Sequence, residues 1–146
     1  MTTKSSANDT QFGGSHYQTE YQHWDFLAVA CGYGEEYYIG CATKYITRYK
    51  KKNGLEDLYK ARHFITKLAE LMEAGLGRGF TAQVPYDKDI AAFCEANEQD
   101  EDQCFVLTVL FEALYPHHLR EAIDRLNLMI DKLERKLLDH NKEQLP

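Results

Sequence analysis

The chain has 146 residues, of which 44% are hydrophobic, and a formal net charge of −6. One domain of this length can bury a sizeable core, whereas two would each be marginal, so we expect a single domain. The absence of any apolar run near the roughly 20 residues that span a bilayer, and of a signal-peptide segment, leads us to expect no membrane partner and a cytoplasmic location.

The first fifteen residues are mostly polar and predict a mobile N-terminal arm, followed by one helical domain over residues 16–146. Beyond the arm, apolar residues recur at helical spacing along most of the chain, which predicts an all-α fold. The expected helices cover residues 19–31, 35–52, 55–74, 89–96, 104–114 and 116–140.

Two glycine-containing segments divide this domain. Asn53 and Gly54 tolerate the left-handed conformation that ends a helix, so the helices on either side should form an antiparallel hairpin. Residues 75–88 are rich in glycine and predict a connector. The domain would then consist of a basic half, residues 16–74, and a supporting helical half, residues 89–146.

The last expected helix carries apolar residues in alternating steps of four and three. Such a regular seam favours packing against a partner helix or another subunit, and we therefore expect a homo-oligomer. The residues of the seam are Leu119, Ile123, Leu126, Ile130, Leu133 and Leu137.

The two halves also resemble each other weakly. Cys31 and Cys41 are ten residues apart, as are Cys94 and Cys104, and "EDLYKARHFITKL" aligns with "EAIDRLNLMIDKL". This pattern indicates a degenerate duplication of a helical unit, with coincidence between two amphipathic hairpins as the equal alternative. The four cysteines show no metal-ligand spacing and are expected to be reduced, buried thiols, and we assign no metal ligands.

Positive charge is concentrated in one segment of this acidic chain. Between Thr43 and Lys67 there are eight Lys or Arg and two acids, a balance of +6, while the remaining residues carry nine basic and 21 acidic side chains. Segregation of this kind indicates a region that binds an anion. The acidic balance of the whole chain argues against a long nucleic acid as the main partner.

The basic segment places its cations on two helical faces that the hairpin would bring together. Lys44, Arg48 and Lys51 or Lys52 share one face, and Glu56, Lys60, His63 and Lys67 share another, with Asp57 beside them. Cations for phosphates, Tyr45 to stack on a base and a carboxylate acceptor are the parts of a nucleotide site. The alternative is a solvated surface held by pairs such as Glu56 with Lys60. The succession Lys50, Lys51 and Lys52 favours an anion, because their mutual repulsion would otherwise be costly.

The same segment resembles a known family. "GGSHYQ", "WDF" and "GCATKYITRYKKKNGLEDLYKARHFITKL" are similar to the small phage family, long labelled SaV-like or of unknown function, that includes the nucleotide kinase of T-odd coliphages. The likeness covers about residues 13–72. Its pattern is carried here by His16, Tyr17, Lys44, Tyr45, Arg48, Lys52, Glu56, Asp57, Leu58, Lys60 and Ala61.

The resemblance implies a phage protein, working in the host cytoplasm, that phosphorylates dTMP and dGMP with ATP or another nucleoside triphosphate and forms a large homo-oligomer. Mg²⁺ is a candidate companion of the donor. There is no G-x-x-x-x-G-K-[ST] loop, so positioning would fall to the basic hairpin. On this basis the expected catalytic residues are Lys44, Arg48 and Asp57, and the expected nucleotide-binding residues are His16, Tyr17, Tyr45, Lys52, Glu56 and Lys60.

Two other functions remain open at this point. Glu98-x-x-Glu101 and Glu121-x-x-Asp124 fit the loose four-acid pattern of all-α, magnesium-dependent nucleoside triphosphate pyrophosphatases, although many acids in one chain produce such matches by chance. A protein that sequesters a nucleotide or a nucleotide-like signal without catalysis would need the same basic, aromatic hairpin.

Overall fold

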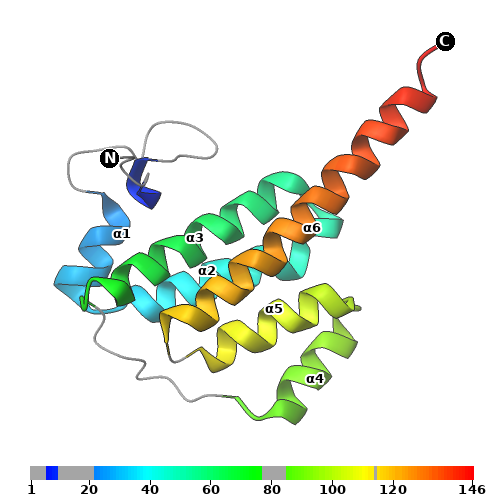
Figure 1. Cartoon of the computed structure of the whole chain (residues 1–146). Coiled ribbons are helices and arrows are strands. Elements are labelled where there is room, and N and C mark those ends of the chain that lie inside the picture. The colour runs from blue at the N-terminus through cyan, green and yellow to red at the C-terminus, as the bar shows by residue number, and fades with distance from the viewer. Residues whose placement is uncertain (1–5, 10–21, 77–84, 114) are drawn as a thin grey trace.

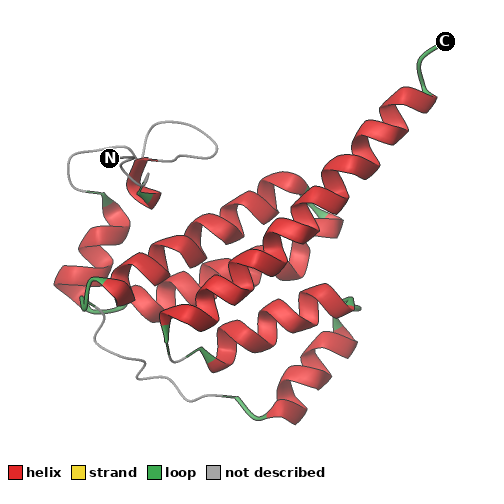
Figure 2. Cartoon of the chain, viewed as in Figure 1, coloured by secondary structure: helices red, strands yellow, loops and turns green. Residues whose placement is uncertain are grey.

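The computed structural model describes residues 6–9, 22–76, 85–113 and 115–146, and the regular elements in these ranges are helices (Figure 2). This confirms the all-α prediction. In chain order the elements are η1 (Ala7–Asp9), α1 (His23–Asp25), the π-helical η2 (Phe26–Cys31), α2 (Gly34–Arg48), the 3₁₀ turn η3 (Tyr49–Lys51), α3 (Leu55–Glu73), α4 (Asp87–Ala96), α5 (Glu101–Glu112) and α6 (Pro116–Glu143).

The helices α2 and α3 form the expected antiparallel hairpin, and α6 packs along α3 (Figure 1). Helix α5 lies against both α2 and α6, and α4 packs on α5 at the edge of the bundle. One core runs through these helices, with Ile46, Leu58, Leu68, Leu107 and Leu126 all fully buried. The second half of the chain therefore supports both helices of the hairpin, through α6 on α3 and α5 on α2.

Helix α6 has a buried part and an exposed part. Leu119 and Leu126 are buried, whereas Leu137 and Leu138 are 45% and 58% exposed, where the helix extends past the rest of the bundle (Figure 1). The amino-terminal part of the seam thus packs within the chain. The homo-oligomer stays a prediction.

Glycines lie at the expected breaks between the helices. Gly32, Gly54 and Gly75 have φ of 77°, 55° and 68°, a region that costs other residues conformational energy. The Gly32 amide donates to the Leu27 carbonyl and closes the turn after η2. Tyr49–Lys51 form a 3₁₀ turn, so α2 ends earlier than the sequence indicated.

The segment expected to be a mobile arm contains residues 6–9, and these are held on α3. Glu70 accepts a hydrogen bond from the Ala7 amide at 2.9 Å, and the Asn8 side chain accepts one from Lys67 Nζ at 2.6 Å. Ala7 is 4% exposed. This part of the arm is therefore docked, because α3 supplies a carboxylate and an ammonium for its polar groups.

Two glycines of α2 have opposite surroundings, and this gives a stability prediction. A Cβ at Gly34 would lie 2.8 Å from Ala28 Cβ and 2.9 Å from Leu71 Cδ2, whereas a Cβ at Gly40 would meet nothing within 4 Å. Gly34→Ala should lower the free energy of unfolding by about 1–3 kcal/mol through overpacking. Gly40→Ala should raise it by about 1 kcal/mol. Denaturant unfolding of the two variants measures both, and an equal effect at the two sites would contradict this packing.

Three further expectations can be compared with the fold. A short helix followed by a helical hairpin occurs in each half, as a duplication requires, but the common origin stays a prediction. The four cysteines are free, with Cys94 buried and the others partly buried. In the described ranges, the helices are all too short or too polar to cross a membrane.

Candidate basic site at the α2–α3 turn

The turn between α2 and α3 is closed by an ion pair between Arg48 and Asp57. Arg48 Nε lies 3.1 Å from Asp57 Oδ2, and Arg48 Nη2 lies 3.0 Å from Asp57 Oδ1. The Asp57 side chain is 0% exposed and the Arg48 side chain 30% exposed. The hydrogen bond that Arg48 donates to Asp57 raises the pKa of the Arg48 guanidinium, so this side chain stays charged.

Asp57 also holds the backbone of the turn. The amide nitrogen and the Nδ2 of Asn53 each lie 3.4 Å from an Asp57 carboxylate oxygen. Both oxygens of this buried carboxylate are therefore engaged within the protein. Arg48, and not Asp57, is the member of the pair that reaches solvent.

Three cations surround the ring of Tyr45. Lys44 Nζ lies 4.8 Å, Arg48 Cζ 4.9 Å and Lys60 Nζ 5.9 Å from the ring centroid. Cations near an aromatic face are attracted by its quadrupole, which partly offsets their mutual repulsion. We call Lys44, Tyr45, Arg48 and Lys60 the Tyr45 cluster, and it brings together four of the residues expected from the sequence.

Phe64 of α3 forms the other wall of this cluster. Its ring stacks on Tyr45 with centroids 6.0 Å apart and an interplanar angle of 18°. One face of Tyr45 is thus covered. Phe64 was not among the residues expected from the sequence, although its position four residues after Lys60 on the same helix places it on the same face.

Glu56 and Lys60 form an ion pair within α3, as expected if this surface is only a solvated helix face. Their side chains are 51% and 23% exposed. Because Glu56 is accessible and beside a cluster cation, it remains in place to accept a hydrogen bond from a ligand. The pair is consistent both with a nucleotide site and with a solvated helix face, so it does not distinguish them.

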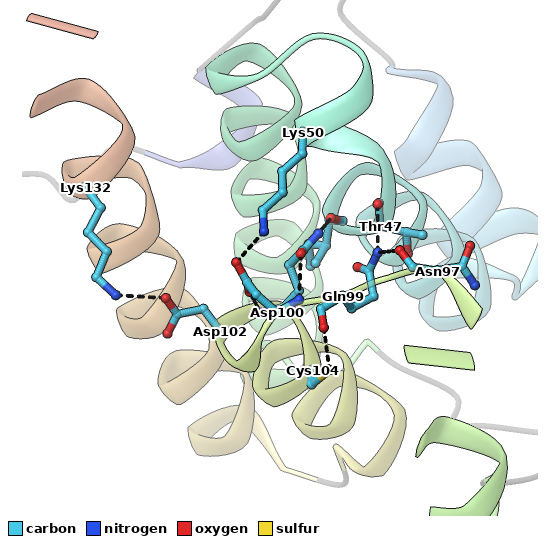
Figure 3. A network of polar contacts seen from close by, with 10 residues as sticks. Thr47, Lys50, Asn97, Gln99, Asp100, Asp102, Cys104 and Lys132 are labelled. Atoms are coloured by element: carbon cyan, nitrogen blue, oxygen red, sulfur yellow. Dashed lines mark hydrogen bonds and ion pairs between the residues drawn. The ribbon is translucent and has the colours of Figure 1, made fainter. Parts of the chain in front are cut away.

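The run of three lysines finds its counter-charges within the chain. Lys50 Nζ lies 2.6 Å from Asp100 Oδ2 (Figure 3), and Lys51 Nζ lies 3.2 Å from Glu98 Oε2. Repulsion within the run is therefore relieved without a bound anion, so, contrary to the prediction, the run by itself does not indicate one. Lys52 is exposed and makes no ion pair with the described residues.

Two members of the expected α3 stripe lie away from the cluster. His63 Nε2 lies 2.5 Å from the Ala7 carbonyl oxygen, and Lys67 Nζ lies 2.6 Å from Asp25 Oδ1. Both therefore serve the docking of the N-terminal segment and α1. Burial lowers the pKa of the His63 imidazole. His16 and Tyr17 lie outside the described residues.

The four-acid pattern is not assembled as a metal site. In the part of the chain that the structure describes, no three His, Cys, Asp or Glu are grouped to hold a metal ion. Glu98 instead pairs with Lys51, and Glu101, Glu121 and Asp124 are exposed.

A pocket of about 420 Å³ lies between α4 and α5, apart from the expected site residues. Its lining contains no Lys or Arg and two acids. It is therefore unsuited to phosphate. The lining residues are Asp87, Ile90, Ala91, Cys94, Glu95, Gln99, Cys104 and Thr108.

Comparison with known proteins bears on the first half of the chain. No curated protein and no solved structure matches it. The model of a family described as a protein of unknown function (DUF3310) matches residues 12–66, a stretch that contains α2, the turn and the Tyr45 cluster.

Proposed function

We propose that this protein binds the phosphate of a nucleotide at the Tyr45 cluster and transfers a phosphoryl group from a nucleoside triphosphate to a deoxynucleoside monophosphate, with dTMP and dGMP as the leading acceptors. The observation that carries the proposal is the convergence of Lys44, Arg48 and Lys60 within 5.9 Å of one aromatic ring. Convergent cations beside a flat apolar wall suit a phosphate joined to a base.

The ion pair with Asp57 gives Arg48 a defined direction. Because Nε and one N–H of Nη2 are bound to the carboxylate, both N–H groups of Nη1 and the second N–H of Nη2 are left to donate to a ligand oxygen. A pre-oriented guanidinium loses less entropy on binding than a free one. Asp57 is accordingly a positioning residue in this proposal, and Lys44, Arg48 and Lys60 are the groups that touch phosphate.

A buried Asp57 is compatible with transfer of a phosphoryl group to a phosphate, because that reaction needs no general base. A non-bridging oxygen of the acceptor phosphate attacks the γ-phosphorus of the donor, the bond from that phosphorus to the bridging oxygen breaks, and the donor leaves as a diphosphate. The second pKa of a phosphate ester is about 6, so the attacking oxygen is already ionised and needs no general base. Fixed cations then lower the barrier by neutralising charge on the transferred group.

Sequestration of a nucleotide without turnover is the alternative that uses the same cluster. Asp57 does not separate the two functions, because its replacement would release Arg48 and so weaken binding in both cases. The reaction products must therefore distinguish a kinase from a protein that only sequesters the nucleotide. Release of pyrophosphate and a monophosphate from a triphosphate would instead favour the four-acid enzyme class.

The experiment is to incubate the full chain with ATP, Mg²⁺ and each deoxynucleoside monophosphate in turn, and to separate products by anion exchange. A deoxynucleoside diphosphate that forms with wild-type protein and is lost with Lys44→Ala supports the kinase. Retention of nucleotide with no product supports sequestration. Failure to bind any nucleotide contradicts the proposal.

Tyr45 gives a separate prediction about the base. Phe64 stacks on one face of the Tyr45 ring, so a base would stack on the opposite face. Since stacking on an aromatic ring contributes about 1–3 kcal/mol, Tyr45→Leu should weaken nucleotide binding about tenfold or more. Tyr45→Phe is the matched control and should bind as wild type does. Equal calorimetric affinities of Tyr45→Leu and wild type would exclude the stacking role.

A further inference from the structure

The Tyr45 cluster has a small excess of charge. Its three cations, Lys44, Arg48 and Lys60, are accompanied by the carboxylates of Asp57 and Glu56, which pair with two of them. One positive charge remains. This suits a single phosphate group, with up to two negative charges, better than a triphosphate, which carries roughly four.

A second group of cations lies at the same turn. Lys50 and Lys51 follow Arg48 within three positions, and their side chains are 45% and 72% exposed. Lys52 continues the run and is exposed. Their partners are the carboxylates of Asp100 and Glu98, 42% and 80% exposed, in the segment that joins α4 to α5. Ion pairs as exposed as these are weak and readily exchanged for other ions.

These ion pairs are not what fixes the α4–α5 segment. Gln99 Nε2 donates to the Thr47 carbonyl at 3.1 Å, and Gln103 Nε2 donates to the Ile46 carbonyl at 2.9 Å (Figure 3 shows the first). Gln103 is 1% exposed and also forms a reciprocal cap with Asp100. Amide bonds to the end of α2 hold the segment, so the lysines can leave their partners while the segment stays in place.

We propose that Lys50, Lys51 and Lys52 form a second anion subsite, which takes the polyphosphate chain of a nucleoside triphosphate, and that Glu98 and Asp100 are exchangeable counter-charges occupying it before the ligand arrives. The inference rests on the proposed function, since it divides the hairpin into a monophosphate site and a polyphosphate site. Weak binders of low charge do not displace two carboxylates, whereas a triphosphate does.

The test compares two probes, inorganic tripolyphosphate and dTMP, by titration calorimetry on the full chain. The combined variant Lys50→Ala, Lys51→Ala and Lys52→Ala should bind tripolyphosphate about tenfold more weakly and dTMP within about twofold of wild type. Lys44→Ala should bind dTMP about tenfold more weakly and tripolyphosphate within about twofold of wild type. Circular dichroism checks that both variants keep the wild-type helix content.

Substitution of Glu98 and Asp100 should have the opposite effect on tripolyphosphate binding. Glu98→Gln with Asp100→Asn removes both counter-charges while asparagine still caps α5, so tripolyphosphate should bind about threefold to tenfold more tightly. Glu101→Gln is a control that removes one negative charge, because Glu101 is exposed nearby and makes no ion pair with the described residues. It should change the affinity much less.

The failures of the two proposals are distinguishable. If wild type binds neither probe, the proposed function fails and this subsite fails with it. If dTMP binds in a Lys44-dependent way while the three lysine substitutions leave tripolyphosphate affinity unchanged, the second subsite alone is overturned. Equal effects of Glu101→Gln and the Glu98, Asp100 pair would also overturn it, since the gain would then reflect net charge only.

Discussion

Arg48→Ala is expected to lower the free energy of unfolding by about 3–5 kcal/mol, because it leaves the fully buried carboxylate of Asp57 without its cation. Few single substitutions of a partly exposed side chain are so costly. Urea unfolding followed by circular dichroism measures the change. Nucleotide affinity should fall in the same variant, since Arg48 belongs to the Tyr45 cluster.

A second substitution identifies the cause of that loss. Adding Asp57→Asn to Arg48→Ala removes the uncompensated charge, so the double variant should regain about half of the lost stability. Nucleotide affinity should not return, because the guanidinium is still absent. If the double variant is as unstable as Arg48→Ala alone, the buried charge is not the source of the instability.

Lys44→Glu is expected to weaken nucleotide binding about 100-fold, because a cation that attracts phosphate becomes an anion that repels it. Stability should change by no more than about 0.5 kcal/mol, since Lys44 is exposed and forms no ion pair with the described residues. Calorimetric titration and urea unfolding measure the two quantities.

Lys136→Glu serves as the control for net charge. Lys136 is exposed on the part of α6 that extends past the bundle, and the substitution makes the same change in total charge. It should reduce affinity by less than about threefold at physiological salt, where distant surface charges are screened. Comparable losses in Lys136→Glu and Lys44→Glu would mean that binding responds to total charge and not to the Tyr45 cluster.

The hairpin could be predicted from sequence because its determinants are local. Asn53 and Gly54 form the turn from which α3 begins, and the spacing of Ile46, Leu58 and Ile65 gives each helix a buried face. The pairing of Lys50 and Lys51 could not be predicted in this way. Their partners, Asp100 and Glu98, lie 50 and 47 residues further along the chain, where helical periodicity carries no information.

The roles of Glu56 and Asp57 show a second limit. Both are acids in the first turn of α3, so propensity and helix-dipole arguments treat them alike. Their side chains lie about 100° apart around the helix, and the docking of α2 decides which of them is buried. Similarly, glycine content alone does not distinguish Gly34, which contacts Ala28 and Leu71, from Gly40, which faces open space.

The buried ion pair at the turn affects how sequence variation among relatives of this chain should be interpreted. Selection for a folded hairpin is enough to retain Arg48 and Asp57, whether or not the protein turns over a substrate, because losing either destabilises the turn. Lys44 makes no ion pair with the described residues, and the fold gains little from it. Retention of Lys44 across divergent sequences would therefore indicate a ligand, whereas retention of Arg48 and Asp57 would indicate only the hairpin.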